Sequence, residues 1–173
     1  MTLRNFTLAP LLVLAACLCA STAFADNLSG QASIIDGDTL EIHGTRVRLW
    51  GIDAPESDQL CRNEDSTQYR CGQKAANDLD AMIARGPVSC VDLDERSYNR
   101  TVAVCTVAGT DIADWLVRNG HALDWPKYSR GAYADAQAEA KREGRGIWQG
   151  SFVEPWAYRA CRREGSTIAS CVD

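Results

Sequence analysis

The sequence has little of the material that several common kinds of active site require. Its 173 residues include only two histidines, His43 and His121. This number argues against a histidine-ligated metal site and against a serine–histidine–aspartate triad. Lysine and arginine number 18 against 23 aspartate and glutamate residues, which excludes a broad basic face that coats nucleic acid. Internal repeats and low-complexity linkers are absent from the sequence. The length predicts one globular domain with a tail.

Long apolar runs are also missing, because no stretch after residue 25 is apolar enough to span a membrane. The first 25 residues differ: Arg4 precedes an apolar run over residues 6–16, and Ala23-Phe24-Ala25 forms a small-x-small cleavage site. These features predict a signal peptide over residues 1–25 and export to the periplasm or the medium. The alternative is a lipoprotein anchored through Cys17, since residues 14–17 resemble a lipobox.

Six cysteines follow residue 25, and no CxxC pair with a second zinc-type half occurs among them. An even number of cysteines in an exported chain predicts disulfides. Strand patterns over residues 88–93 and 101–107 place Cys90 opposite Cys105. The remaining pairs are then local, Cys61–Cys71 and Cys161–Cys171. Each bridge is expected to add roughly 2–4 kcal/mol of stability.

A β-hairpin is predicted near the start of the mature chain. Residues 39–42 and 46–49 alternate apolar and polar side chains at period two, around a turn at residues 43–45. With the turn centred near residues 44 and 45, Asp38 and Asp53 lie about equally far along the two arms. Both carboxylates should therefore return to the same end of the ribbon.

The other elements are predicted helices and one further hairpin. Helices are expected over residues 73–84, after an N-cap at Asp111, and over residues 132–142, with a loop at residues 125–131. The order of strands, helix, strands, helix, helix predicts a mainly β protein of the α+β class, with a small barrel capped by helices. The predicted division is residues 1–25 for the signal peptide, 26–157 for the domain and 158–173 for a disulfide-stapled surface extension.

The hairpin region carries the chemistry. It holds four acidic residues and two arginines, Asp36, Asp38, Asp53, Glu56, Arg46 and Arg48. Calcium takes several oxygen ligands, which Asp38 and Asp53 are suited to supply, and Glu56 is suited to orient or deprotonate a water. Arg48 and a second arginine from elsewhere would hold phosphate oxygens. Each piece alone also fits an ordinary turn or a solvated strand, but together they predict phosphodiester hydrolysis.

Four segments in this order carry a family resemblance: IDGDTL, RVRLWGIDAPE, Tyr98-Asn99-Arg100 and AQAEAKREGRGIW. Together they resemble the thermonuclease family, also called staphylococcal nuclease-like or micrococcal nuclease, over about residues 28–156. The resemblance implies an OB-fold, a five-stranded β-barrel with three helices, and calcium-dependent cleavage of DNA and RNA that leaves 3′-phosphate ends. Asn99 replaces a glycine of the family, and asparagine is expected to accept the positive φ there. A monomer is the default expectation.

The resemblance also implies which residues would bind the metal. Asp38 and Asp53 match the calcium-binding aspartates, and Ala54 matches the residue that lends its backbone carbonyl. Asp36 matches an acidic residue that lies near the metal and acts through water.

Five more residues are expected to act on the substrate. The resemblance implies that Glu56 activates the water and that Arg48 and Arg100 hold the scissile phosphate. Tyr98 and Tyr128 are expected to stack on or bond to a nucleotide, with plain packing as the alternative.

Two other functions remain open from the sequence. The first is a catalytically silent OB-fold module that binds an oligonucleotide or a protein in the barrel groove. The second is a disulfide-stapled envelope protein whose metal site is only structural.

Overall fold

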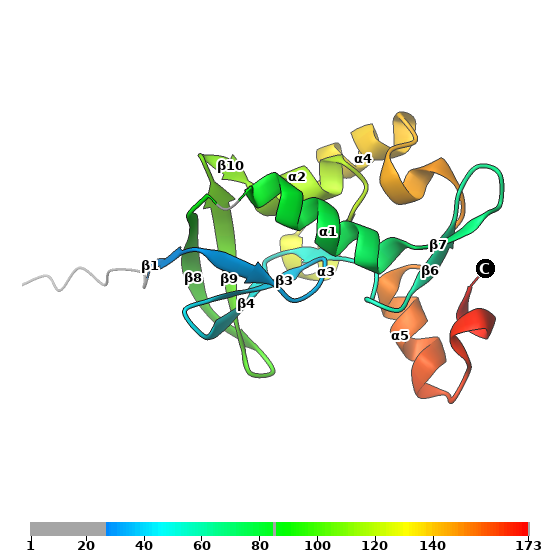
Figure 1. The fold of residues 1–173 in the computed structure, drawn as a ribbon, viewed down its shortest axis with the longest axis horizontal. Coiled ribbons are helices and arrows are strands. Elements are labelled where there is room, and N and C mark those ends of the chain that lie inside the picture. Colours follow the sequence, from blue (N-terminus) through cyan, green and yellow to red (C-terminus); the bar gives the residue numbers. More distant parts are fainter. Residues whose placement is uncertain (1–26, 85, 173) are drawn as a thin grey trace, which may run out of the picture.

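The computed structural model describes residues 27–84 and 86–172. Figure 1 shows a curled sheet with helices packed along one side of it, and α5 and the C-terminal turn beyond the end of the sheet. The signal peptide predicted over residues 1–25 and its alternative, a lipid anchor at Cys17, lie outside the described residues. Within them, no helix combines the length and the apolar character needed to cross a bilayer.

The main sheet contains seven strands in the order β1-β8-β9-β4-β3-β2, with β10 paired to β9. Their bounds are β1 (Asn27–Gly30), β2 (Ala32–Ile34), β3 (Thr39–Ile42), β4 (Thr45–Leu49), β8 (Val88–Ser97), β9 (Arg100–Val107) and β10 (Thr110–Asp111). All pairs are antiparallel except β4 with β9, which run parallel and place Arg48 opposite Val102. This pairing brings the first hairpin beside the strand that begins at Arg100.

The helices are α1 (Cys71–Ile83), α2 (Ile112–Arg118), α3 (Pro126–Ser129), α4 (Ala134–Arg142) and α5 (Pro155–Arg163), with 3₁₀ turns η1 (Gly146–Gln149) and η2 (Ile168–Cys171). The predicted N-cap is confirmed, because the Asp111 carboxylate accepts hydrogen bonds from the Ala113 and Asp114 amides. The predicted loop at residues 125–131 instead contains α3, which begins at a proline in its favoured first position.

The predicted α+β class is confirmed, and the curled sheet is consistent with an OB-fold. The counts differ from the resemblance: the described residues form seven strands in the main sheet rather than five, and five α-helices rather than three. The extra helices include the short α3 and α5, which lies near the C-terminus.

The first hairpin forms as predicted, but its turn is shorter. Ile42 pairs with Thr45, so His43 and Gly44 alone make the turn, with φ values of 51° and 80°. That is the pattern of a two-residue hairpin turn. The expected position of Asp53 on the second arm is wrong, because the chain leaves the sheet after β4. Asp53 belongs to the short strand β5 (Ile52–Asp53), which pairs with β11 (Leu123–Asp124).

The β8–β9 hairpin confirms the predicted register, with Cys90 opposite Cys105. The register shifts between Asp92 and Glu95, where a bulge lets the strands continue to the pair Ser97–Arg100. Positive φ falls on Tyr98, at 57°, and not on Asn99, where it was expected. Arg100 is therefore the first residue of β9, directly after a tight turn.

All three predicted disulfides form, Cys61–Cys71, Cys90–Cys105 and Cys161–Cys171. Their number indicates an oxidising, extracytoplasmic location. The first bridge joins a small two-stranded sheet, β6 (Leu60–Arg62) and β7 (Gln68–Arg70), to the start of α1.

The apolar interior has two parts. The larger core fills the space between the curled sheet and helices α1, α2 and α4, with Leu40, Leu49, Leu79 and Leu116 at most 1% exposed. A smaller cluster contains the Cys61–Cys71 bridge and Ile147, and Trp156 of α5 packs against it. The second cluster therefore fixes α5 beside the loop that follows Asp53.

Candidate active site

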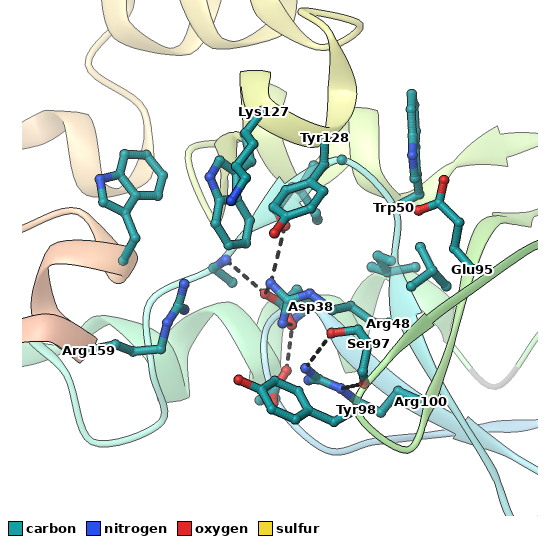
Figure 2. A pocket seen from close by; sticks show the side chains of 18 of the residues that line it. Asp38, Arg48, Trp50, Glu95, Ser97, Tyr98, Arg100, Lys127, Tyr128 and Arg159 are labelled. Carbon is teal, nitrogen blue, oxygen red and sulfur yellow. Dashed lines mark hydrogen bonds and ion pairs between the residues drawn. The ribbon is translucent and has the colours of Figure 1, made fainter. Parts of the chain in front are cut away.

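A cleft of about 570 Å³ lies between the sheet and the segments around α3 and α5. Its lining includes Asp38, Arg48, Glu56, Tyr98, Arg100 and Arg159. Figure 2 shows that the side chains of Arg48, Arg100 and Arg159 approach the same region from different elements of the chain. The structure therefore brings sequence-distant charged groups into one cleft.

The turn before β3 fixes the first two aspartates. The Asp38 amide donates to the Asp36 carboxylate at 3.0 Å. Burial, followed by the negative charge of Asp38, raises the pKa of Asp36 to about 6. Glycine is required between them, because a Cβ on Gly37 would lie 2.7 Å from the Ala54 Cβ. The Ala54 amide in turn donates to Asp38 Oδ2 at 3.1 Å, so the Asp38 turn packs directly on the segment that follows Asp53.

Arg48 joins the two buried aspartates. Its Nη1 donates to Asp38 Oδ1 at 2.9 Å. Its Nη2 lies 2.9 Å from Asp38 Oδ2 and 2.8 Å from Asp53 Oδ1. Burial disfavours the charge on Arg48, but the two carboxylates outweigh it and raise the pKa of the guanidinium. Arg46, two residues away, is outside the site and pairs with Glu41 at the surface.

Arg100 reaches the same network from the neighbouring strand. Its Nη1 donates to Thr39 Oγ1 at 3.0 Å, and its Nη2 donates to Ser97 Oγ at 3.2 Å. The Thr39 hydroxyl then donates to Asp38 Oδ1 at 3.0 Å. The parallel pairing of β4 with β9 is the reason that both arginines point to one place.

Glu56 lies at the rim, with 38% of its side chain exposed. Its backbone is held tightly: the Glu56 amide donates to Gln59 Oε1 at 3.1 Å, and the Gln59 amide donates to the Glu56 carbonyl at 2.8 Å. At the start of α1, Gly72 allows a close approach, since a Cβ there would lie 1.9 Å from the Glu56 carbonyl oxygen. A partly solvated carboxylate on a fixed backbone has the freedom to contact a water molecule.

Arg159 is the principal residue that the sequence interpretation missed. It was expected on a surface extension, but its side chain is 29% exposed and lies in the cleft. Its two Nη atoms donate to both oxygens of Asp53, at 3.0 and 2.8 Å, and Nη1 also donates to Glu56 Oε1 at 2.8 Å. The only signal for it in the sequence is a group of arginines near the C-terminus, which gives no indication of a partner 106 residues away.

Asp53 is the most buried acid of the group, with no exposed side-chain surface. Burial raises its pKa, and the hydrogen bonds from Arg159 oppose that shift. Its two oxygens are occupied by guanidinium groups from Arg48 and Arg159. The charge of this buried carboxylate therefore depends on arginines from both ends of the chain.

An aromatic side chain supports both of these arginines. The Trp125 ring centroid lies 5.9 Å from Arg48 Cζ and 5.5 Å from Arg159 Cζ, within the range of cation–π contacts. Trp125 also stacks on Trp156 of α5, with centroids 6.0 Å apart. Aromatic spacing along the sequence did not indicate this contribution, because the two tryptophans belong to different elements.

The two tyrosines lie on opposite sides of the cleft. Tyr98, at the tip of the β8–β9 hairpin, is 95% exposed, and Tyr128 of α3 is 45% exposed. Tyr128 packs edge-on against Trp125, and Lys127 lies over its ring at 5.3 Å. Both residues therefore retain exposed surface at the cleft.

The donor chemistry of the site fits a hard cation. Asp38 and Asp53 are buried, and one nitrogen of Arg48 lies within 2.9 Å of an oxygen of each. Carboxylate oxygens are the ligands that calcium prefers. Across residues 27–84 and 86–172, no three His, Cys, Asp or Glu side chains converge as a ready metal cluster. The two aspartates would therefore need backbone oxygen and water to complete a calcium site, and the Ala54 backbone lies beside Asp38.

The fold and the cleft together define a class of protein. A curled sheet of an α+β chain carries buried aspartates that are linked by arginines, in a cleft whose groups suit a cation and a phosphate. The chain belongs to the family described as Staphylococcal nuclease homologue, which it matches over residues 46–150. That range contains Arg48, Asp53 and Arg100, while Asp38 precedes it and Arg159 follows it.

Several curated proteins are similar to this chain. "Succinoglycan biosynthesis protein ExoI" of Rhizobium meliloti is 45% identical over 153 residues, covering 87% of this chain and 80% of that protein. An "Uncharacterized endonuclease" of Haemophilus influenzae is 30% identical over 77% of this chain and 73% of that protein. "Micrococcal nuclease" of Shigella flexneri is 29% identical over 83% and 87%. The family thus includes nucleases and endonucleases, together with a relative named for succinoglycan biosynthesis.

Proposed function

We propose that this chain is an exported, calcium-dependent nuclease that hydrolyses phosphodiester bonds of DNA and RNA and leaves 3′-phosphate ends. The observation that carries the proposal is the position of Arg48, which bridges the two buried aspartates while Arg100 joins the same network through Thr39. Two guanidinium groups beside two buried carboxylates suit a phosphate and a cation bound side by side. Membership of the nuclease family supports this assignment.

Each residue has a role in the proposed reaction. Asp38, Asp53 and the Ala54 carbonyl would hold calcium, with Asp36 acting near it through water. Calcium, when bound, supplies positive charge that offsets the negative charge of the reacting phosphate. Glu56 accepts the proton of the attacking water at its carboxylate, because it is partly exposed at the rim.

The arginines and tyrosines act on the substrate in this proposal. Arg48 and Arg100 orient the scissile phosphate and stabilise the charge that develops on its oxygens. Tyr98 and Tyr128 present accessible rings on the two sides of the cleft, where bases of a single strand can stack. The acidic net charge of the whole chain makes these local contacts the main means of holding a polyanion.

The alternative function is a catalytically silent module that binds an oligonucleotide or a protein in the cleft. One observation favours it: the oxygens of Asp53 are already paired with Arg48 and Arg159. A scaffold needs no more than such a satisfied network. The complete set of acids and arginines favours the enzyme, because the Glu56 side chain stays 38% exposed at the rim although it also pairs with Arg159.

The test is cleavage of 5′-labelled single-stranded DNA by the mature protein in calcium and in EDTA. Glu56→Gln is expected to lower the rate by about 10²-fold or more, since a general base contributes on that order. Arg100→Ala is expected to lower it by about 10²-fold, the scale of one lost transition-state donor. Glu95→Gln, an exposed carboxylate lining the same cleft, is the matched control and should retain wild-type activity.

Three outcomes would contradict the proposal. Binding of DNA without turnover at saturating calcium would favour the silent module. A rise in melting temperature with calcium, without cleavage, would indicate a structural metal site. Cleavage of succinoglycan, with DNA and RNA left intact, would instead connect the site with the compound in the name of the similar Rhizobium protein.

A further inference from the structure

The guanidinium group of Arg159 places a positive charge on Asp53. The proposed function assigns this contact no role. We propose that Arg159 competes with calcium for Asp53, so that its guanidinium must leave this carboxylate before a cation can bind there. The C-terminal helix α5 would then set the calcium affinity of the site. The inference rests on the proposed function because it concerns the same carboxylates.

The contacts of Arg159 occupy the ligand that calcium needs. Two nitrogens face the two oxygens of Asp53 at 3.0 and 2.8 Å, and one of them also reaches Glu56 at 2.8 Å. This is the bidentate geometry that makes arginine–carboxylate pairs strong. Calcium would sit about 2.3–2.6 Å from the same oxygens. The Arg159 guanidinium and a cation therefore compete for the oxygens of Asp53, of which Oδ1 also accepts a hydrogen bond from Arg48.

The backbone of α5 holds Arg159 close to the site in either state. The Tyr158 hydroxyl donates to Asp58 at 3.0 Å, and the ring is 2% exposed. Gln59 Nε2 donates to the Val153 carbonyl at 2.6 Å. These contacts join the helix to the loop that begins at Glu56, so the exchange requires a movement of the Arg159 side chain and not of the helix.

The Trp125 ring can hold the Arg159 side chain after it leaves Asp53. The guanidinium carbon of Arg159 already lies 5.5 Å from the centroid of Trp125, whose face attracts a cation without a carboxylate. As Figure 2 shows, Arg159 approaches the cleft from the side of α5, away from Arg100 and Tyr98. The side chain can therefore leave Asp53 while its charge stays within the cleft.

The test is a calorimetric titration of calcium into the full mature protein without substrate. Removing the competitor in Arg159→Gln should tighten calcium binding by about tenfold, a factor that corresponds to about 1.4 kcal/mol. Arg159→Lys keeps the charge but loses the bidentate contact, so its calcium affinity should lie between those of the wild type and Arg159→Gln. Arg163→Gln is the matched control, because Arg163 is an exposed arginine of the same helix that lines the same cleft. It should change the calcium affinity by less than about twofold.

A melting experiment provides a second readout. In EDTA, Arg159→Gln should melt several degrees below the wild type, because Asp53 loses one of its two cationic partners, and a saturating amount of calcium should remove most of this difference. Equal affinities in wild type and Arg159→Gln, an equal gain in Arg163→Gln, or no calcium binding by either protein would overturn the inference. Loss of cleavage with calcium binding intact would contradict the proposed nuclease function alone.

Discussion

The two walls of the cleft are built by different means. The sheet wall carries Arg48 and Arg100 on the neighbouring strands β4 and β9, and Asp38 in the turn directly before β3, so backbone register fixes their spacing. The helical wall carries Arg159 on α5, which the hydrogen bond from Tyr158 to Asp58 ties to the loop after Asp53 and which the Cys161–Cys171 bridge joins to η2. Asp53 lies between the walls and is paired with both. In our proposals, the sheet wall supplies one calcium ligand and the two phosphate-binding arginines, while Arg159 on the helical wall competes with calcium for Asp53.

The largest effect is expected on the sheet wall, at Arg48. Arg48→Gln leaves two buried carboxylates with fewer partners, so we expect a loss of about 3 kcal/mol in the free energy of unfolding. Cleavage should fall by about 10²- to 10³-fold. The matched control is Arg46→Gln on the same strand, whose side chain is 60% exposed. It should change stability by less than about 0.5 kcal/mol. Equal losses in the two variants, by denaturant unfolding, would contradict this division.

Removing one disulfide at a time tests the two walls separately, because Cys90–Cys105 lies in the sheet wall and Cys161–Cys171 in the helical wall. Replacing Cys90 and Cys105 by alanine should cost about 3 kcal/mol, because the bridge closes a 15-residue separation. It should also lower turnover more than calcium affinity, since Arg100 lies in the same hairpin. Replacing Cys161 and Cys171 should instead raise the calcium affinity, because a less restrained Arg159 competes less well for Asp53. The same changes in both double variants, measured by cleavage rates and calcium titration, would show that the two walls are not separable.

The smallest effect is expected at the hairpin tip. Tyr98→Asn removes a ring that is 95% exposed, and asparagine tolerates the positive φ of this position. Stability should therefore stay within about 0.5 kcal/mol of the wild type. The KM for single-stranded DNA should rise by about tenfold, the order of one lost base-stacking contact. A falling melting temperature with unchanged KM would assign Tyr98 a structural role.

The sheet wall was predictable because its determinants are local in sequence. The alternation in residues 39–49 defined the hairpin, and the strand register around Cys90 and Cys105 was correct at the bridge. The exact turn positions could not be predicted from the sequence. The turn centre moved to residues 43 and 44, and positive φ fell on Tyr98 because the bulge after Asp92 re-registers the strands.

The helical wall could not be predicted because nothing near Arg159 in the sequence indicates its partners. Its contact with Asp53 depends on a second apolar cluster, in which Trp156 packs against the Cys61–Cys71 bridge. Such a contact arises from tertiary packing, and neither periodicity nor a motif reports it. The position of Asp53 was missed for the same reason, since β5 pairs with a strand 70 residues away.

The calcium dependence of cleavage tests the contrast between the two walls most directly. Single-turnover rates on labelled single-stranded DNA would be measured across a calcium titration for the wild type, Arg159→Gln and Glu56→Gln. We predict that Arg159→Gln reaches its half-maximal rate at about tenfold lower calcium, and that Glu56→Gln has a maximal rate at least about 10²-fold lower. An unchanged calcium midpoint in Arg159→Gln, or a wild-type maximal rate in Glu56→Gln, would contradict the account.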